Sequence, residues 1–142
     1  MSLFLVFVQA SAEAASCFDQ AGDLYHVSPS LLRAIAKQES GMNPRAIHIN
    51  RDGTKDYGLM QINERWFPHL KQLGISGQKL MEPCQNIHVS AYILRLLFNR
   101  HGENWRAVGR YNASHPVKAA GYAWKIHKKL KEVKEPLGVL RR

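Results

Sequence analysis

Glu39 is the residue whose position in the sequence points most directly to chemistry. It follows Ile35 by four residues, so on a helix the two side chains lie on the same face. A carboxylate on an apolar face is half-buried, and burial raises its pKa because it disfavours the charged form. A carboxylic acid that is still protonated near neutral pH is suited to protonate a glycosidic leaving oxygen. The alternative is that Glu39 only caps the helix end or pairs with Lys37 or Arg33.

Asp56 is the second candidate carboxylate, in an irregular segment directly before Tyr57 and Gly58. If Glu39 and Asp56 face each other across a cleft, they form the acid-plus-carboxylate pair of a glycosidase. Their separation would then set retaining or inverting geometry. The alternative is that Asp56 is a turn residue that accepts hydrogen bonds from nearby backbone N–H groups. The residues alone leave both interpretations open.

Side chains suited to binding sugar accompany these carboxylates. Aromatic rings stack on the apolar faces of pyranose rings, and amides bond the hydroxyl and acetamido groups. Trp66 and Phe67 fit the core as well as a ligand site, and Trp105 and Trp124 are expected in the core, because large aromatic residues dominate small helical cores. The candidate sugar-binding residues are Tyr57, Gln61, Asn63, Trp66, Tyr111, Asn112 and Tyr122.

Composition and the remaining motifs narrow the choice of function. The 142 residues are 45% hydrophobic and 22% charged, which is typical of one globular domain. Lys and Arg number 20 against 11 Asp and Glu, so the surface should attract nucleic acid, anionic lipid or acidic wall polymer. No Gly-rich phosphate loop, RNA-binding aromatic signature or Ser-His-Asp arrangement appears, so we expect no nucleic-acid partner and no cofactor. We also expect no metal site, because no two of these histidines have i,i+4 spacing and no cysteine joins them: His48, His69, His88, His101, His115 and His127.

The N-terminal residues predict export. Leu3 to Val8 is an apolar run, and the small residues from Ala10 to Ser16 offer Ala-x-Ala cleavage frames. The run is too short to span a membrane and lacks a basic n-region, so a truncated start or a loose apolar arm is the alternative. We therefore expect residues 1–16 to be a signal peptide, and the mature protein to be periplasmic or exported, at the cell wall, with no transmembrane span.

Cys17 and Cys84 both follow the expected cleavage point. In an oxidising compartment an even pair favours a disulfide, which here would stabilise the fold by about 2–4 kcal/mol. Two buried thiols are the first alternative. A lipidated Cys17 is the second, although the preceding residues lack the Leu usual three positions before such a cysteine.

Helices interrupted by one irregular region are expected to position these side chains. The segment from Ser28 to Gly41 begins with a hydroxyl cap and a proline and repeats apolar residues at helical spacing. Residues 45–63 carry turn residues and no helical face, which predicts a hairpin or a lobe-bridging loop. Helical periodicity returns from Pro83 to His101. Further helices are expected over residues 17–26, 105–112 and 117–133, and a loose basic tail over 135–142.

Three segments, Glu39-Ser40-Gly41, Gly58-Leu59-Met60-Gln61-Ile62-Asn63 and Tyr111-Asn112-Ala113-Ser114, stand in this order along the chain. They resemble the three signature segments of the soluble lytic transglycosylases with a goose-lysozyme-like fold, over about residues 17 to 130. The third segment departs from that pattern, because it ends in Ser114 where Gly is expected. The small size and the cysteine pair look most like the specialised members that open the wall for secretion systems, pili or conjugation machinery.

Residues 51–66 also resemble the active-site hairpin of the c-type lysozymes, and the interval from Glu39 to Asp56 matches the spacing of the acid and its partner carboxylate there. Many ordinary transglycosylases have no acid at the position of Asp56. The chain departs from c-type lysozymes too, since it has one possible disulfide and they have a set. The chain therefore combines features of the soluble lytic transglycosylases and of the c-type lysozymes.

The two resemblances imply a mainly helical, lysozyme-like fold with a small hairpin lobe (α+β), a single domain over residues 17–134 and a cleft beside the lobe of residues 45–70. They imply that Glu39 acts as catalytic acid and base and that Asp56 assists. Tyr111 would orient Glu39 or the substrate, and the backbone at Gly58 would closely approach the sugar. Substrate-binding roles are implied for Ser40, Tyr57, Gly58, Met60, Gln61, Asn63, Tyr111, Asn112 and Tyr122.

The activity so implied is cleavage of the β-1,4 bond between N-acetylmuramic acid and N-acetylglucosamine in peptidoglycan, with 1,6-anhydro ends formed for local wall opening. Peptidoglycan is then the partner, together with proteins of a secretion or pilus apparatus. Two alternatives stay open: a hydrolytic, lysozyme-like muramidase and a non-catalytic wall-binding adaptor of a secretion apparatus.

Overall fold

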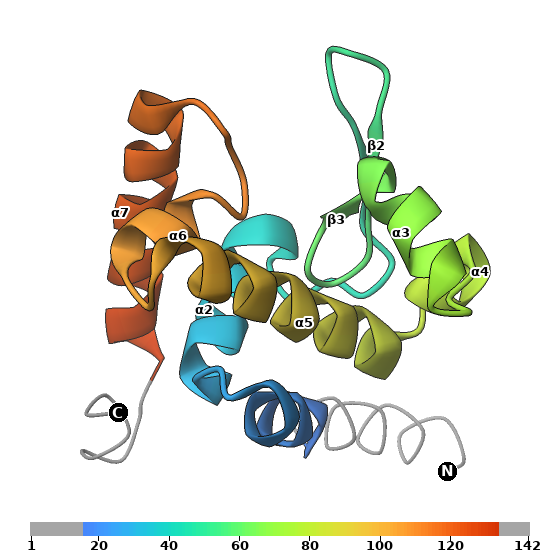
Figure 1. Cartoon of the computed structure of the whole chain (residues 1–142), viewed down its shortest axis with the longest axis horizontal. Helices are drawn as coiled ribbons and strands as arrows, with labels where there is room; N and C mark the ends of the chain where they lie inside the picture. Colours follow the sequence, from blue (N-terminus) through green and yellow to red (C-terminus); the bar gives the residue numbers. More distant parts are fainter. Residues whose placement is uncertain (1–15, 134–142) are drawn as a thin grey trace, which may run out of the picture.

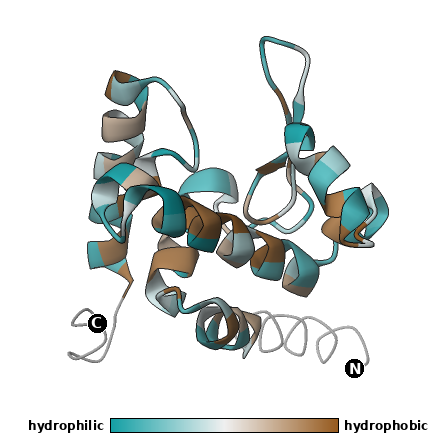
Figure 2. Cartoon of the chain, viewed as in Figure 1, coloured by the Kyte–Doolittle hydropathy of each residue, from teal (hydrophilic) through white to brown (hydrophobic). Residues whose placement is uncertain are grey.

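The computed structural model describes residues 16–133, and its helices gather around one central helix, α5 (Pro83–His101). Figure 1 shows α5 crossing the molecule between α7 and the strand-bearing lobe. Hydrophobic residues concentrate along α5, as Figure 2 shows, and seven of its residues are buried. Residues 1–15 of the expected signal and the expected tail over 135–142 lie outside the described residues.

Helix α2 (Pro29–Ser40) carries Glu39 and begins and ends as its sequence predicts. The Ser28 side chain accepts a hydrogen bond from the backbone N–H of Leu31 at 3.3 Å, which caps the N-terminus. Gly41 ends the helix in the left-handed conformation with φ 60°, and its N–H bonds to the carbonyl of Lys37. The apolar face of α2 is buried, which fixes the direction in which its last turn projects.

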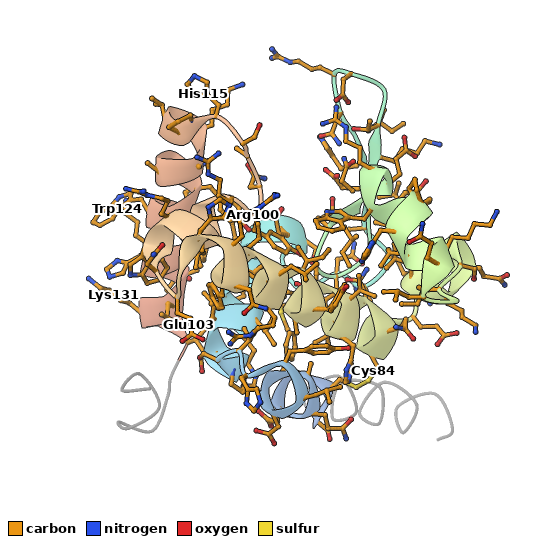
Figure 3. All side chains as sticks on the ribbon, in the orientation of Figure 1. Cys84, Arg100, Glu103, His115, Trp124 and Lys131 are labelled. Carbon is orange, nitrogen blue, oxygen red and sulfur yellow. A yellow bond between two sulfur atoms is a disulfide. The ribbon has the colours of Figure 1, made fainter. Side chains whose placement is uncertain are left out.

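A disulfide holds the helical residues 16–25 against α5. Cys17 and Cys84 are bonded, with their Cα atoms 5.4 Å apart and a separation of 67 positions in the sequence. Cys84 lies in the first turn of α5, next to the N-terminal helix in Figure 3. Of the three interpretations of the cysteines, the disulfide is confirmed.

The irregular region forms a small antiparallel sheet, in the order β1 (Ile47–Ile49), β2 (Lys55–Tyr57) and β3 (Ile62–Asn63). The expected hairpin is present, and a third strand extends it. In the register of this sheet Asp56 lies opposite Asn63 on one side and His48 on the other. The polar turn between β1 and β2 is closed by the N–H of Asn50, which donates to the carbonyl of Thr54 at 2.8 Å.

Short helices that the sequence analysis did not predict lead from the sheet to α5. They are the 3-10 helix η1 (Glu64–Trp66), α3 (Phe67–Gln72) and α4 (Gly77–Leu80). Leu70 of α3 and Leu80 of α4 are buried, so each of these two helices contributes a side chain to the core. The lobe is therefore packed onto the helical body rather than suspended as a loop.

Helices α6 (Trp105–Gly109) and α7 (Pro116–Glu132) complete the body, and α7 packs against both α2 and α6. Helix α6 is shorter than expected, since the chain turns over residues 110–112. The Arg110 side chain bonds to the carbonyl of Ser114 across this turn, and Tyr111 is anchored toward α5 by its hydroxyl group.

The expectation that Trp105 and Trp124 lie in the core is wrong, because their side chains are 40% and 58% exposed. The buried residues of α7 are Ala119, Tyr122, Ala123 and Ile126, and Trp124 falls on the other side of the helix. Figure 3 shows Trp124 on the outer side of α7.

The fold class is as expected: a mainly helical single domain with a small three-stranded sheet. Within residues 16–133, no helix is both long and apolar enough to cross a membrane.

Candidate active site

A pocket of about 640 Å³ lies between the sheet, the last turn of α2 and the turn before α7. Its lining contains both candidate carboxylates, Glu39 and Asp56. Most of the other lining side chains are amides, hydroxyls and bases. The two acids, 17 positions apart in sequence, are therefore brought to one polar cavity.

Glu39 has a pKa raised from an ordinary value of 4.5 to about 7. Burial is the main cause, since it disfavours the charged form, and the charge of Asp56 acts in the same direction. A hydrogen bond from Tyr122 and the charge of Lys125 partly oppose the rise. Near neutral pH the carboxyl is divided between its protonated and ionised forms, as a group that alternates between acid and base requires.

Tyr122, on α7, holds Glu39 directly. Its hydroxyl donates to Glu39 Oε1 at 2.5 Å. Burial and the neighbouring Glu39 charge raise the pKa of Tyr122, so this hydroxyl keeps its proton and remains a donor. The direct hydrogen bond to Glu39 thus comes from Tyr122 and not from Tyr111.

Tyr111 also lines the pocket, and its contacts join three parts of the structure. Its hydroxyl donates to the carbonyl of Met60 at 2.8 Å and lies 2.9 Å from Ser90 Oγ. Its ring stacks with that of Tyr122, with centroids 6.4 Å apart and planes 18° apart. Burial also raises its pKa. Tyr111 therefore joins α5, the sheet lobe and the tyrosine that holds Glu39.

Asp56 is held by amides and not by a basic side chain. Asn63 Nδ2 donates to Asp56 Oδ1 at 2.7 Å, and Asn50 Nδ2 donates to Asp56 Oδ2 at 3.0 Å. Both amides come from positions beside it in the sheet or its turn, and both donors satisfy the charged form without neutralising it. The carboxylate is thus fixed in the pocket with its negative charge available to a positive centre.

Among the residues proposed to bind sugar, Gln61, Asn63, Trp66, Tyr111 and Asn112 line this pocket. Trp66 is partly buried and presents an aromatic surface in an otherwise polar lining. Basic side chains also line the pocket: Arg51, Arg65 and Lys118.

Five other proposed binding residues do not line the pocket: Ser40, Tyr57, Gly58, Met60 and Tyr122. Ser40 Oγ donates to the carbonyl of Leu59 at 2.6 Å and ties α2 to the sheet lobe. Tyr57 packs on the ring of Phe67, with centroids 5.3 Å apart. The Met60 side chain is fully buried, so its expected contact with substrate is corrected to a core position; only its backbone carbonyl meets the site, through Tyr111.

The structure gives a reason for glycine at position 58 that differs from the expected close approach of the backbone to sugar. Its φ is 77°, in the left-handed region, and a Cβ here would lie 2.5 Å from Nδ2 of Asn86. The glycine therefore allows α5 to approach the sheet lobe closely. Gly58 shapes the site from behind and does not line it.

Asn86 was missed by the sequence analysis, although it organises this junction. It is fully buried on α5, and its Oδ1 accepts from the N–H of Met60 at 2.7 Å. Its Nδ2 donates to the carbonyls of Tyr57 and Leu80 at 2.9 and 3.0 Å. The one available signal was a polar residue directly before Ile87 on a helical apolar stripe.

Several known proteins are similar to this chain over most of its length. It is 44% identical to protein IpgF of Shigella flexneri over 100 residues, which are 70% of this chain and 66% of IpgF, just under two thirds of its length. It is 43% identical to invasion protein IagB of Salmonella typhi over 127 residues, or 84% of this chain and 79% of IagB. It is also 42% identical to the X polypeptide of Escherichia coli over 114 residues, which are 80% of this chain and 68% of the X polypeptide.

The family model described as "Transglycosylase SLT domain" matches residues 16–130. The match contains all three segments that carried the resemblance, together with Glu39, Asp56 and the tyrosine pair that surrounds the acid. The family resemblance seen in the sequence is thereby confirmed. The chain belongs to the transglycosylase SLT domain family.

Proposed function

We propose that this chain is a peptidoglycan lytic transglycosylase, with Glu39 as its catalytic acid and base. The observation that carries the proposal is the environment of Glu39. A carboxyl with a pKa of about 7 faces a polar pocket and is held by one tyrosine hydroxyl. Such a group gives up and takes back a proton within one reaction cycle near neutral pH.

In the first step Glu39 donates its proton to the oxygen that links N-acetylmuramic acid to N-acetylglucosamine. The C1–O bond breaks, and an oxocarbenium-like centre forms at C1 of the muramic residue. The Glu39 carboxylate then takes the proton of the muramic 6-hydroxyl, whose oxygen attacks C1. The products are a 1,6-anhydromuramic end and a free 4-hydroxyl on N-acetylglucosamine. Tyr122 assists by holding the carboxylate that exists between the two steps.

Asp56 supplies electrostatic stabilisation in this proposal. Two amides fix it on the wall of the same pocket, and its charge already reaches Glu39, whose pKa it raises. A fixed negative charge lowers the energy of a positive centre that develops nearby, and it does so without reorganisation. The substrate acetamido group would share this task, so the role of Asp56 is secondary to that of Glu39.

A hydrolytic muramidase is the second candidate, and the same Asp56 favours it. A carboxylate opposite the acid is the arrangement of the lysozyme-type glycosidases, in which water replaces the 6-hydroxyl as the attacking group. Both candidates use Glu39 in the same way. They differ only in the oxygen that reaches C1, and hence in whether the new end contains an added water.

We further propose that the protein acts outside the cytoplasm, after loss of residues 1–16, with residues 17–134 as the catalytic domain. The Cys17–Cys84 disulfide supports an oxidising compartment, and the family match over residues 16–130 supports the domain limits. We also propose that the protein opens the cell wall locally for a secretion or pilus apparatus, and similarity to IagB, which is named an invasion protein, supports this role. The bases that line the pocket suit an acidic wall polymer.

Release of soluble fragments from purified peptidoglycan tests the enzymatic proposal. Glu39→Gln should reduce release to background, while Asp52→Asn serves as the matched control. Asp52 also lines the pocket, but it pairs with Arg65 and bonds to Thr54 within its own turn. The wild type and Asp52→Asn should both release fragments. If folded Glu39→Gln still releases fragments at the wild-type rate, Glu39 is not the acid; if the wild type releases none, the adaptor hypothesis replaces the enzyme.

A further inference from the structure

A second pocket, of about 730 Å³, lies between α6 and α7. Two of its lining residues are the exposed tryptophans Trp105 and Trp124, which the core does not use. Between them stands His127, whose ring is stacked with Trp124 at 5.5 Å and edge-on to Trp105 at 5.2 Å. Two exposed tryptophans therefore share one mainly apolar pocket, and exposed apolar surface that is gathered in this way is a candidate interaction site.

The lining chemistry is the opposite of that in the candidate active site. Alanines and a proline form the rest of the apolar surface, and the charged members are Arg106 and Arg110. No amide, hydroxyl or carboxylate side chain lines this second pocket, whereas such groups dominate the first. A saccharide needs partners for its hydroxyls, so this pocket is poorly equipped for glycan.

The indole of Trp124 is also poorly placed to stack on a sugar ring. His127 is nearly parallel to it, at an interplanar angle of 11°, and the Lys128 ammonium lies 5.5 Å from its ring centroid. Ring faces that these two side chains partly cover are less available to a pyranose. What remains open is the apolar edge of the pocket, which suits an inserted aliphatic or aromatic side chain.

Two arginines, Arg106 and Arg110, bring positive charge to the pocket. Within residues 16–133, Arg110 Nε is a buried nitrogen without a hydrogen-bond partner, and another nitrogen of the same guanidinium donates to the carbonyl of Ser114. Arg106 takes part in none of the salt bridges within the same described part of the chain. With no acidic residue in the lining, carboxylates from a ligand have a ready place to bind.

We propose that the pocket between α6 and α7 is a docking site for a partner protein, which places an apolar side chain against the apolar lining beside Trp105 and Trp124 and Asp or Glu residues against Arg106 and Arg110. A second copy of this chain is disfavoured as the occupant, because each copy carries a net charge of +9 at pH 7. The site is separate from the carboxylates of the first pocket, so the proposal does not depend on the proposed activity.

Selection from a phage-displayed library of random peptides on the full chain tests this docking site. The selected peptides should combine a large apolar residue with neighbouring Asp or Glu. Their affinities would be measured by calorimetry for the wild type, Trp124→Ser and Arg106→Glu. Leu24→Ser is the matched control, since Leu24 is 61% exposed and lies on another helix. Arg106→Glu keeps both tryptophans and so tests the charge separately from the packing.

Both pocket variants should bind the selected peptides about tenfold more weakly or worse, as truncating an interface anchor does, while Leu24→Ser binds like the wild type. Both pocket variants should also release wall fragments at the wild-type rate. Equal binding by all variants overturns the proposal, as does a selection without acidic and apolar residues. It is also overturned if chitotetraose, titrated as a glycan probe, changes the Trp124 indole resonance in NMR spectra, because the pocket would then hold sugar.

Discussion

Replacing Glu39 by Gln should abolish activity and at the same time stabilise the fold at alkaline pH. Gln has nearly the same shape but does not ionise, so it removes the cost of burying a charge. The pKa of Glu39 is raised from 4.5 to about 7. At 1.36 kcal/mol for each pH unit, this rise corresponds to about 3 kcal/mol of folding free energy.

The sign follows from comparing proton binding in the two states. The unfolded carboxyl loses its proton near 4.5 and the folded one near 7, so between these values the folded state binds more protons. The stability that Glu39 contributes is complete below pH 4.5 and is lost as the pH rises through 7. Because a glutamine side chain does not titrate, the free energy of unfolding of the Glu39→Gln variant should rise relative to that of the wild type by about 3 kcal/mol over this pH window.

Urea unfolding of both proteins, from about pH 4 to about pH 8, measures this difference. The difference between variant and wild type should grow with pH and level off above 7. Glu132→Gln is the control, because Glu132 is an exposed carboxylate on α7 that pairs with Lys129. The difference in unfolding free energy between this control and the wild type should not grow comparably with pH. A constant difference between wild type and Glu39→Gln across the range would refute the claim that Glu39 is buried with a raised pKa.

Three other perturbations test separate parts of the site and scaffold. Tyr122→Phe removes the bond that lowers the pKa of Glu39, so the pH–rate midpoint of wall lysis should move upward and turnover should fall about 10- to 100-fold; an unmoved midpoint would contradict the assigned bond. Asp56→Asn should slow turnover about 10- to 1000-fold with little change in melting temperature, and full activity would reduce Asp56 to a turn residue. Replacing Cys17 and Cys84 by Ser should cost about 2–4 kcal/mol in urea unfolding, and unchanged stability would argue against a stabilising bridge.

The long helices were predictable because their signals are local. Caps and apolar spacing defined α2 from Ser28 to Gly41, and α5 follows Pro83 as periodicity indicates. The short helices α3 and α4 carry too few turns for a periodic pattern, so only packing onto the core reveals them. Trp124 was misplaced because the size of an aromatic side chain suggests burial, whereas its angular position on α7 decides it.

The raised pKa of Glu39 was predictable from one spacing, because a carboxylate on the apolar face of a helix is buried when that face packs on the core. Its hydroxyl partner was not predictable in the same way. Tyr122 lies 83 residues further along the chain and reaches Glu39 only because α7 packs on α2. Asn86 likewise acts across 26 residues, through a bond to the N–H of Met60. Long-range polar contacts of this kind leave no periodic trace in the sequence.

Digestion of purified peptidoglycan by the wild-type protein in H₂¹⁸O, followed by mass spectrometry, tests the central claim most directly. If Glu39 removes the proton of the muramic 6-hydroxyl and the oxygen of that group attacks C1, the new ends are 1,6-anhydromuramic residues. These ends are one water lighter than reducing ends and contain no ¹⁸O. Reducing ends that carry one ¹⁸O would show that water is the attacking group, and would contradict the transglycosylase in favour of the muramidase.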